Sequence, residues 1–100
     1  MLFESPSIDK VLDVSTAHVL QSDVSLLNRD DSPLVAYEYQ EGFFLSSHLG
    51  DEDCNLDSLR KWGFSDAFLN IFDYARTNDI RWINLDSAGM VYEELPVFEW

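Results

Sequence analysis

The amino-acid sequence predicts an α+β domain, built from a mostly antiparallel sheet of about four strands with helices on one face. Three observations support this fold class. Strand-like and helix-like segments follow in the order strand, helix, two strands, two helices, strand. The two central strands flank a short turn, and Ile80–Asp86 carries large apolar side chains on both faces, as an inner strand does. With 100 residues, the chain 1–100 is expected to form a single domain.

The first part of the chain predicts a strand and a short helix. Val11–Val19 is rich in β-branched residues, which favour strands. Ser22 is a typical N-cap residue, and Asp23 after it suits the positive end of a helix. We expect this helix to bury Val24 and to end near Asn28.

The middle of the chain carries the clearest local pattern. Leu34–Tyr39 and Phe43–Ser47 are typical of strands, and they flank the three-residue loop 40–42. Gly42 in this loop is expected to adopt a left-handed conformation. The segment therefore predicts a β-hairpin. Side-chain alternation places three residues on one face of its first strand: Val35, Tyr37 and Tyr39.

Two capped helices follow the hairpin. Asn55 can cap the first, which we expect to end at Gly63 as its C′ residue. Ser65 can cap the second, whose apolar side chains repeat with helical spacing on one stripe: Phe68, Ile71, Phe72 and Ala75. After the strand at Ile80–Asp86, the closing Val97–Trp100 is expected to form an edge strand or a tail packed by its aromatic rings.

The composition bounds the class of function. Nineteen acidic against six basic residues give a net charge of −13, which repels nucleic acid and anionic membranes and attracts basic partners. A single cysteine, Cys54, excludes an internal disulfide and suits a reducing compartment. No apolar run reaches the length of a membrane span, and the first residues lack the features of a signal peptide. The sequence therefore predicts a cytoplasmic protein with no membrane partner and no direct contact with nucleic acid.

The negative charge is concentrated in residues 30–59, which hold eight acids and no base. Such an uneven distribution implies an acidic side and a nearly neutral side of the folded domain. The candidate partner-binding residues are these eight: Asp30, Asp31, Glu38, Glu41, Asp51, Glu52, Asp53 and Asp57.

Candidate metal and catalytic sites match their patterns poorly. Residues 51–57 place oxygen-bearing side chains at alternate positions, as a calcium loop does, but Leu56 stands where that loop needs glycine. Ser15, His18 and Asp86 are the residue types of a hydrolase triad, yet no glycines flank the serine as in a nucleophile elbow. We expect no metal, no cofactor and no catalytic residue, and His18 to be a structural hydrogen-bond partner.

Three short motifs resemble a group of small uncharacterised bacterial proteins. The motifs are Ser15–Val19 (STAHV), Trp82–Asp86 (WINLD) and Leu95–Trp100 (LPVFEW). The proteins of this group occur on plasmids and other mobile elements. Small acidic proteins of such elements include anti-CRISPR and antirestriction inhibitors that imitate DNA. The resemblance implies this context, and it brings no assigned activity and no catalytic residue.

The charge and the resemblance together predict a non-enzymatic protein that binds a basic, nucleic-acid-binding surface of a protein partner. In its sharpest form this is a DNA-mimic inhibitor of a defence system, with carboxylates replacing phosphates at arginine and lysine side chains. Two alternatives stay open. The charge can serve solubility or salt adaptation, with an aromatic patch around Trp62, Phe64 or Trp100 as the interface of an adaptor. Alternatively, the protein is an enzyme whose polar side chains converge in a pocket.

Overall fold

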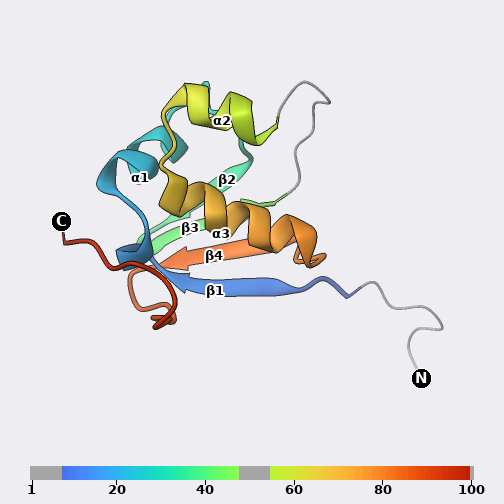
Figure 1. The fold of residues 1–100 in the computed structure, drawn as a ribbon, viewed down its shortest axis with the longest axis vertical. Helices are drawn as coiled ribbons and strands as arrows, with labels where there is room; N and C mark the ends of the chain where they lie inside the picture. The colour runs from blue at the N-terminus through green and yellow to red at the C-terminus, as the bar shows by residue number, and fades with distance from the viewer. Residues whose placement is uncertain (1–7, 48–54, 100) are drawn as a thin grey trace.

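The computed structural model describes residues 8–47 and 55–99 (Figure 1). Their elements, in chain order, are β1 (Val11–Ser15), the 3₁₀ helix η1 (Thr16–His18), α1 (Gln21–Leu27), β2 (Ala36–Tyr39), β3 (Gly42–Ser46), α2 (Leu56–Trp62), α3 (Asp66–Thr77) and β4 (Trp82–Asp86). None of the helices in these two ranges is long and apolar enough to cross a membrane.

The four strands form one mixed sheet in the order β1-β4-β3-β2. β1 and β4 run parallel, while the β4–β3 and β3–β2 pairs are antiparallel. The strand predicted at Ile80–Asp86 is β4, which has a neighbour on each side as expected. The prediction of an α+β fold with a mostly antiparallel sheet is confirmed, and β1 and β2 are the edges of the sheet.

One face of the sheet packs into the hydrophobic core together with the apolar sides of the helices. The inward strand residues are Val14, Phe43, Leu45, Ile83 and Leu85. The predicted stripe of α3 is buried in the same core, and Phe72 at its centre is completely inaccessible to solvent. Figure 1 shows α3 lying along the sheet. Because apolar burial is the main favourable term in folding, this stripe holds α3 in place.

Side-chain caps fix where α2 and α3 begin. At the start of α2, Ser58 N–H donates to Asn55 Oδ1 at 3.0 Å and Asn55 N–H donates to Ser58 Oγ at 2.9 Å. Gly63 ends this helix in the left-handed region, with a φ of 113°. At the start of α3, Phe68 N–H donates to Ser65 Oγ at 3.2 Å. The predicted caps of both helices, and the predicted end of α2 at Gly63, are therefore confirmed.

A buried carboxylate ties the starts of α1 and α3 together. Asp23 is fully buried, and its oxygens accept hydrogen bonds from Leu20 N–H at 2.9 Å, from Ser65 N–H at 2.7 Å and from the Ser65 hydroxyl at 2.6 Å. One side chain thus satisfies main-chain donors at two helix N-termini, which otherwise lack partners inside their helices.

The hairpin is present, but its turn differs from the prediction. The loop is only Gln40–Glu41, because Gly42 is already the first residue of β3 and pairs with Tyr39. Gly42 is not left-handed; within the described ranges, Gly63 is the glycine with a positive φ. A Cβ at position 42 would overlap the Leu85 carbonyl group. Glycine is needed there because β3 approaches β4 closely.

Two predicted boundaries near the start of the chain were wrong. β1 ends at Ser15, well short of Val19, because Ser15 Oγ accepts a hydrogen bond from Ala17 N–H at 3.1 Å and turns the chain into η1. Ser22 does not cap α1, because the helix already begins at Gln21 and its N-cap position is Leu20, whose N–H donates to the Asp23 carboxylate. A local propensity for strand or cap was overruled in both places by a neighbouring side chain.

The closing residues form a packed tail rather than an edge strand. Phe98 N–H donates to the Ala17 carbonyl oxygen at 2.8 Å, and the Tyr92 hydroxyl donates to the Asp13 carbonyl oxygen at 2.7 Å. These bonds hold the segment 90–99 beside β1 and η1 (Figure 1). Of the two predicted possibilities, the tail is the one observed.

Candidate functional site

Three of the eight predicted partner-binding carboxylates lie along one groove. Asp30, Glu38 and Glu41 line two hollows between α1 and the β2–β3 hairpin, with volumes of about 360 Å³ and about 620 Å³. The hollows share Glu38 and Phe43, so they are neighbours along the hairpin. We call this feature the acidic groove. Its lining comprises Thr16, Val24 and Leu27–Asp30, Ser32, Leu34–Ala36, Glu38–Phe43 and Ser87.

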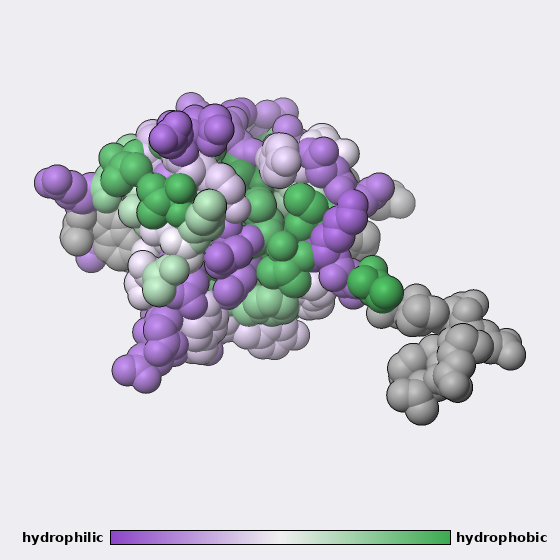
Figure 2. Space-filling view, turned by 90° about the horizontal axis from the view of Figure 1, so that it is seen from below, coloured by the Kyte–Doolittle hydropathy of each residue, from purple (hydrophilic) through white to green (hydrophobic). Residues whose placement is uncertain are grey.

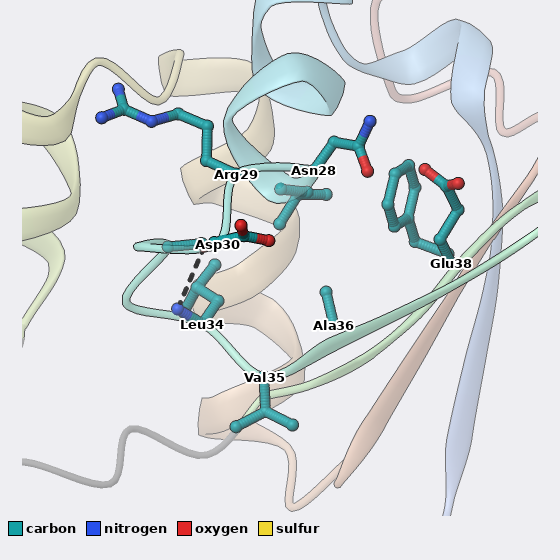
Figure 3. A pocket seen from close by; sticks show the side chains of 10 residues that line it. Asn28, Arg29, Asp30, Leu34, Val35, Ala36 and Glu38 are labelled. Carbon is teal, nitrogen blue, oxygen red and sulfur yellow. Dashed lines mark hydrogen bonds between the residues drawn. The ribbon is translucent and has the colours of Figure 1, made fainter.

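The walls of the acidic groove come from the helix and from the edge of the sheet. Figure 3 shows the Asn28 amide and the Glu38 carboxylate reaching toward the same space from these two walls. Glu38 lies opposite the buried Phe43 in the hairpin register, so its side chain is on the core-facing side of the sheet. Between α1 and β2 the chain reverses direction in a turn, where Leu34 N–H donates to Ser32 Oγ at 3.3 Å. Local turn chemistry therefore brings Asp30 beside β2.

Within the described residues, none of the three groove carboxylates takes part in an ion pair. In residues 8–47 and 55–99, no ion pair or side-chain hydrogen bond engages Asp30, Glu38 or Glu41. The basic residue in the lining is Arg29, and its side chain points away from the hollow in Figure 3. Its guanidinium makes two hydrogen bonds to Asp31, at 2.9 and 2.8 Å, and lies 5.3 Å from the Trp62 ring centre. The groove is thus left with uncompensated negative charge.

The other predicted carboxylates do not join this groove. Asp31 is occupied by Arg29, while Asp57 lies on α2 and pairs with Arg60 at 3.3 Å. Asp51, Glu52 and Asp53 lie outside the described residues. The first four residues of the candidate calcium loop fall on the same segment, as does Cys54. Elsewhere in the described chain, no three histidine, aspartate or glutamate side chains come together as metal ligands would.

The face of the sheet that points away from the core is a second candidate surface, which we call the open sheet face. Tyr37 pairs with Phe44 across the hairpin, and the Phe44 ring stacks on Trp82 with ring centres 4.9 Å apart. Val11 on the edge strand β1 and Val35 just before the edge strand β2 are each about half exposed. Alternation in the sequence placed Val35 and Tyr37 on one face, but it did not show that this face points away from the core.

Exposed apolar side chains also gather on the side of β1. Figure 2 views the molecule from below, and green side chains lie in the middle of this side between purple ones. The exposed apolar residues of β1 and its surroundings are Ile8, Val11, Met90 and Val91. An aromatic patch was predicted around Trp62, Phe64 or Trp100, and the structure describes the first two of these residues. Phe64 is buried and stacks on Phe68, Trp62 is half-buried beside Arg29, and Trp100 lies outside the described residues.

A hydrogen-bonded cluster links the hairpin to β4. The Tyr39 hydroxyl lies 2.6 Å from Asp86 Oδ2 and 2.7 Å from Asn84 Oδ1. Burial, the hydrogen bond to Asp86 and the charges of Asp86 and Glu41 raise the pKa of Tyr39 to about 12. The same hydrogen bond, with a second from Ala88 N–H, lowers the pKa of Asp86. Tyr39 stays neutral and Asp86 stays ionised near neutral pH, so the cluster holds the hairpin in a fixed position.

Ser15, His18 and Asp86 do not form a hydrolase triad in the described residues: Ser15 and Asp86 are paired across β1 and β4, but each of the three side chains is bonded to another partner. His18 is fully buried, its Nδ1 lies 2.7 Å from the Pro96 carbonyl oxygen, and its Nε2 accepts a hydrogen bond from Tyr92 N–H at 2.8 Å. Ser15 is bonded within its own turn, and Asp86 is bonded to Tyr39. The predicted structural role of His18 is confirmed, because both ring nitrogens hold the tail to η1.

Three comparisons place the chain among known proteins. A search of curated proteins found no match, and a search of solved structures found none either. The model of the C-terminal domain of a family of unknown function, DUF5983, matches residues 11–100. That match covers every helix and strand described above. The chain therefore belongs to the DUF5983 family, through the C-terminal domain of that family.

Proposed function

We propose that this protein is a non-enzymatic, acidic interaction protein that binds a basic surface of a protein partner through the acidic groove. One observation carries the proposal: Asp30, Glu38 and Glu41 line one groove and have no cationic partner in the described chain. Arginine and lysine side chains are the natural occupants, because they form charge-assisted hydrogen bonds with carboxylates. A net charge of −13 would also speed the approach of a basic partner at low salt.

The sharper version of the proposal is mimicry of DNA. A partner surface built for phosphates would accept carboxylates in their place, and the mimic would then compete with nucleic acid for it. The resemblance to small proteins of mobile elements favours a partner in a host defence system. Asp51, Glu52, Asp53 and Asp57 are kept as further contacts in this proposal.

Affinity capture from bacterial lysate with matched variants tests the proposal. The groove variant carries Asp30→Asn, Glu38→Gln and Glu41→Gln. The control variant removes three charges from the exposed tail: Glu93→Gln, Glu94→Gln and Glu99→Gln. We expect the parent protein and the control to capture the same basic proteins at low salt, and the groove variant to lose them. Equal capture by the two variants would contradict a role of the groove.

Adding double-stranded DNA to the same capture separates mimicry from simple charge attraction. We expect DNA to displace the captured partner from the parent protein, because both anions occupy one basic surface. If DNA does not displace the partner but the groove variant still fails to capture it, the acidic groove is the interface and the protein does not mimic DNA.

The open sheet face supports a second candidate, an adaptor that binds a partner through aromatic contacts. Its stacked Phe44 and Trp82 and the exposed Tyr37 present rings of the kind enriched at protein interfaces. Changing Tyr37 and Val35 to threonine keeps β propensity but removes apolar contact area. If this face is the interface, the double variant loses a partner that high salt does not release. A partner that the double variant retains, but the groove variant loses, argues against the adaptor.

A further inference from the structure

The two edges of the sheet are treated differently. The outer edge of β1 is partly closed by the tail, since Ser15 N–H donates to the Met90 carbonyl oxygen at 2.9 Å and the Tyr92 hydroxyl donates to Asp13. No such cover exists for β2 in the described residues. Exposed strand edges invite pairing with another chain, and proteins normally blunt them. In the described residues, the edge of β2 is open and lies beside groove carboxylates that have no ion-pair partner, which suggests a role in binding.

The unpaired main-chain groups of β2 can be assigned from its register. Ser46 N–H donates to the Val35 carbonyl oxygen at 2.9 Å, and hydrogen-bonded pairs alternate along an antiparallel ladder. Ala36 and Glu38 consequently direct their N–H and C=O groups away from β3. Neither residue makes a main-chain hydrogen bond outside the ladder in the described residues. β2 therefore offers two donors and two acceptors in extended geometry.

The two sides of this edge differ in chemistry. On the core-facing side, Glu38 stands in the acidic groove between Asp30 and Glu41. On the open sheet face, Tyr37 is exposed and continues the row to Phe44. A strand added next to β2 would place alternate side chains on these two sides. It would meet carboxylates on one side and an aromatic surface on the other.

We propose that an extended, basic segment of the partner protein adds to β2 as a fifth strand of the sheet. Its alternate side chains are arginine or lysine, which enter the acidic groove, and the side chains between them are apolar and pack beside Tyr37. The segment gains main-chain hydrogen bonds from Ala36 and Glu38 and charge-assisted contacts from the groove carboxylates. This inference rests on the proposed function and adds the form of the partner and its residue pattern.

A second copy of the chain is a poor occupant of the same edge. Antiparallel pairing of two β2 strands would bring two acidic grooves together, and each copy carries a net charge of −13. Like charges on neighbouring strands are destabilising. Glu38 on the core-facing side of β2 thus disfavours pairing with a second copy of the chain. The same charge favours pairing with a basic strand of another protein.

Synthetic peptides test the proposal with the intact protein. The parent peptide alternates arginine with valine or tyrosine, and a control peptide of the same composition places all its arginines together. We expect calorimetry at low salt to show at least about tenfold tighter binding of the alternating peptide. Its binding should also slow amide exchange at Ala36 and Glu38.

N-methylation separates strand addition from attraction between charges. One peptide is methylated on the nitrogens of its arginines, and the other on the nitrogens of its apolar residues. Only one of the two sets faces β2, so one methylated peptide should lose at least about tenfold in affinity while the other retains it. The set that matters reports whether the added strand runs parallel or antiparallel. Equal affinities of the two methylated peptides would overturn strand addition.

Variants of the protein show whether strand addition fails or the proposed function itself fails. Glu38→Gln should weaken the alternating peptide by about three- to tenfold at low salt, whereas the matched Glu94→Gln in the tail should leave it unchanged. If the groove variant loses its captured partner while both methylated peptides bind equally, the acidic interface stands and the added strand does not. If the groove variant keeps its captured partner, the proposed function fails, whatever the peptides show.

Discussion

At the scale of single residues, Tyr39 connects the two candidate surfaces. Tyr39 lines the acidic groove near Glu41, and its hydroxyl is hydrogen-bonded to Asn84 and Asp86 on β4. Gly42 lies directly opposite Tyr39 in the hairpin register. Together with the hydrogen bond from Ser87 N–H to the Glu41 carbonyl oxygen at 2.9 Å, this phenol holds the hairpin tip against β4.

The Tyr39 pKa gives a prediction about alkaline pH. Its pKa in the folded protein, about 12, is above the ordinary value of 10. The folded state therefore favours the neutral phenol, and the resulting stabilisation is complete below pH 10 and is lost as pH rises from 10 to 12. Ultraviolet titration of tyrosinate should show a late step that Tyr39→Phe removes and Asp86→Asn moves to lower pH. A titration curve unchanged by Tyr39→Phe would contradict the hydrogen-bonded cluster.

The Asp86 carboxylate works in the opposite direction. Its pKa is lowered from 3.8, so its stabilising effect is present above pH 3.8 and is lost as pH falls through the lower folded value. We expect Asp86→Asn to reduce the difference in stability between neutral and acidic pH. Urea unfolding at neutral pH and below pH 3.8 measures this difference, and an unchanged difference would argue against the bond to Tyr39.

Asp23 is the residue whose loss should cost the most stability for its size. Asp23→Ala leaves main-chain donors of Leu20 and Ser65 without partners inside the protein. Breaking a buried, hydrogen-bonded charge site typically costs roughly 3–5 kcal/mol. Urea denaturation of this variant, compared with Asp73→Ala on α3, measures the effect. Equal stability of the two variants would mean that Asp23 does not hold the two helix starts together.

At the scale of elements, the sequence predicted what local chemistry decides. The start and the buried face of α3 were predicted because its cap, Ser65, and its apolar stripe lie close together in the sequence. The hairpin was predicted for the same reason. The role of Gly42 was not, because it depends on a contact with Leu85, which is far away in the sequence. The end of β1 was missed because a serine side chain, rather than propensity, redirects the chain.

The candidate site was predictable only in part. The base-free segment 30–59 identified the carboxylates, but it could not show which of them share a surface. Packing of α1 against the hairpin gathers Asp30 with Glu38, and ion pairing removes Asp31 and Asp57. The open edge of β2 could not be found from sequence either, since strand order in the sheet is set by long-range pairing.

Truncating the central buried side chain of α3 should destabilise the protein. Phe72 is completely buried, and Phe72→Ala should cost roughly 3–5 kcal/mol, because it removes apolar contacts and leaves a cavity. Tyr74→Ala on the same helix is the control, as this side chain is largely exposed. Denaturant unfolding of both variants should show a lowered midpoint for Phe72→Ala and a midpoint near the parent value for Tyr74→Ala. Similar midpoints would contradict the burial of the stripe.

At the scale of the whole molecule, the dominant property is charge. Nineteen acids against six bases leave most carboxylates without a basic partner, and three of the basic side chains, Arg29, Arg60 and Arg81, already take part in ion pairs. The remaining negative charges repel one another across the surface. This repulsion is a cost of folding that a basic partner would relieve on binding.

Stability should therefore rise with salt at neutral pH. Screening shortens the range of repulsion from about 30 Å at 0.01 M salt to about 3 Å at 1 M salt. We expect the melting temperature in sodium chloride to increase over this range. The groove variant with three amides should gain less, because it has less repulsion to screen. A melting temperature that salt leaves unchanged would mean that the acids are dispersed enough not to interact.

The central claim is that basic groups bind in the acidic groove rather than anywhere on an acidic surface. An NMR titration with a short arginine peptide at low salt tests it most directly, since every assigned main-chain amide reports its own surroundings. We expect the largest shifts to fall in residues 28–43, to saturate together, and to disappear in the Asp30→Asn, Glu38→Gln, Glu41→Gln variant. Shifts of equal size at Glu93, Glu94 and the acids of α2 and α3, unaffected by that variant, would contradict it.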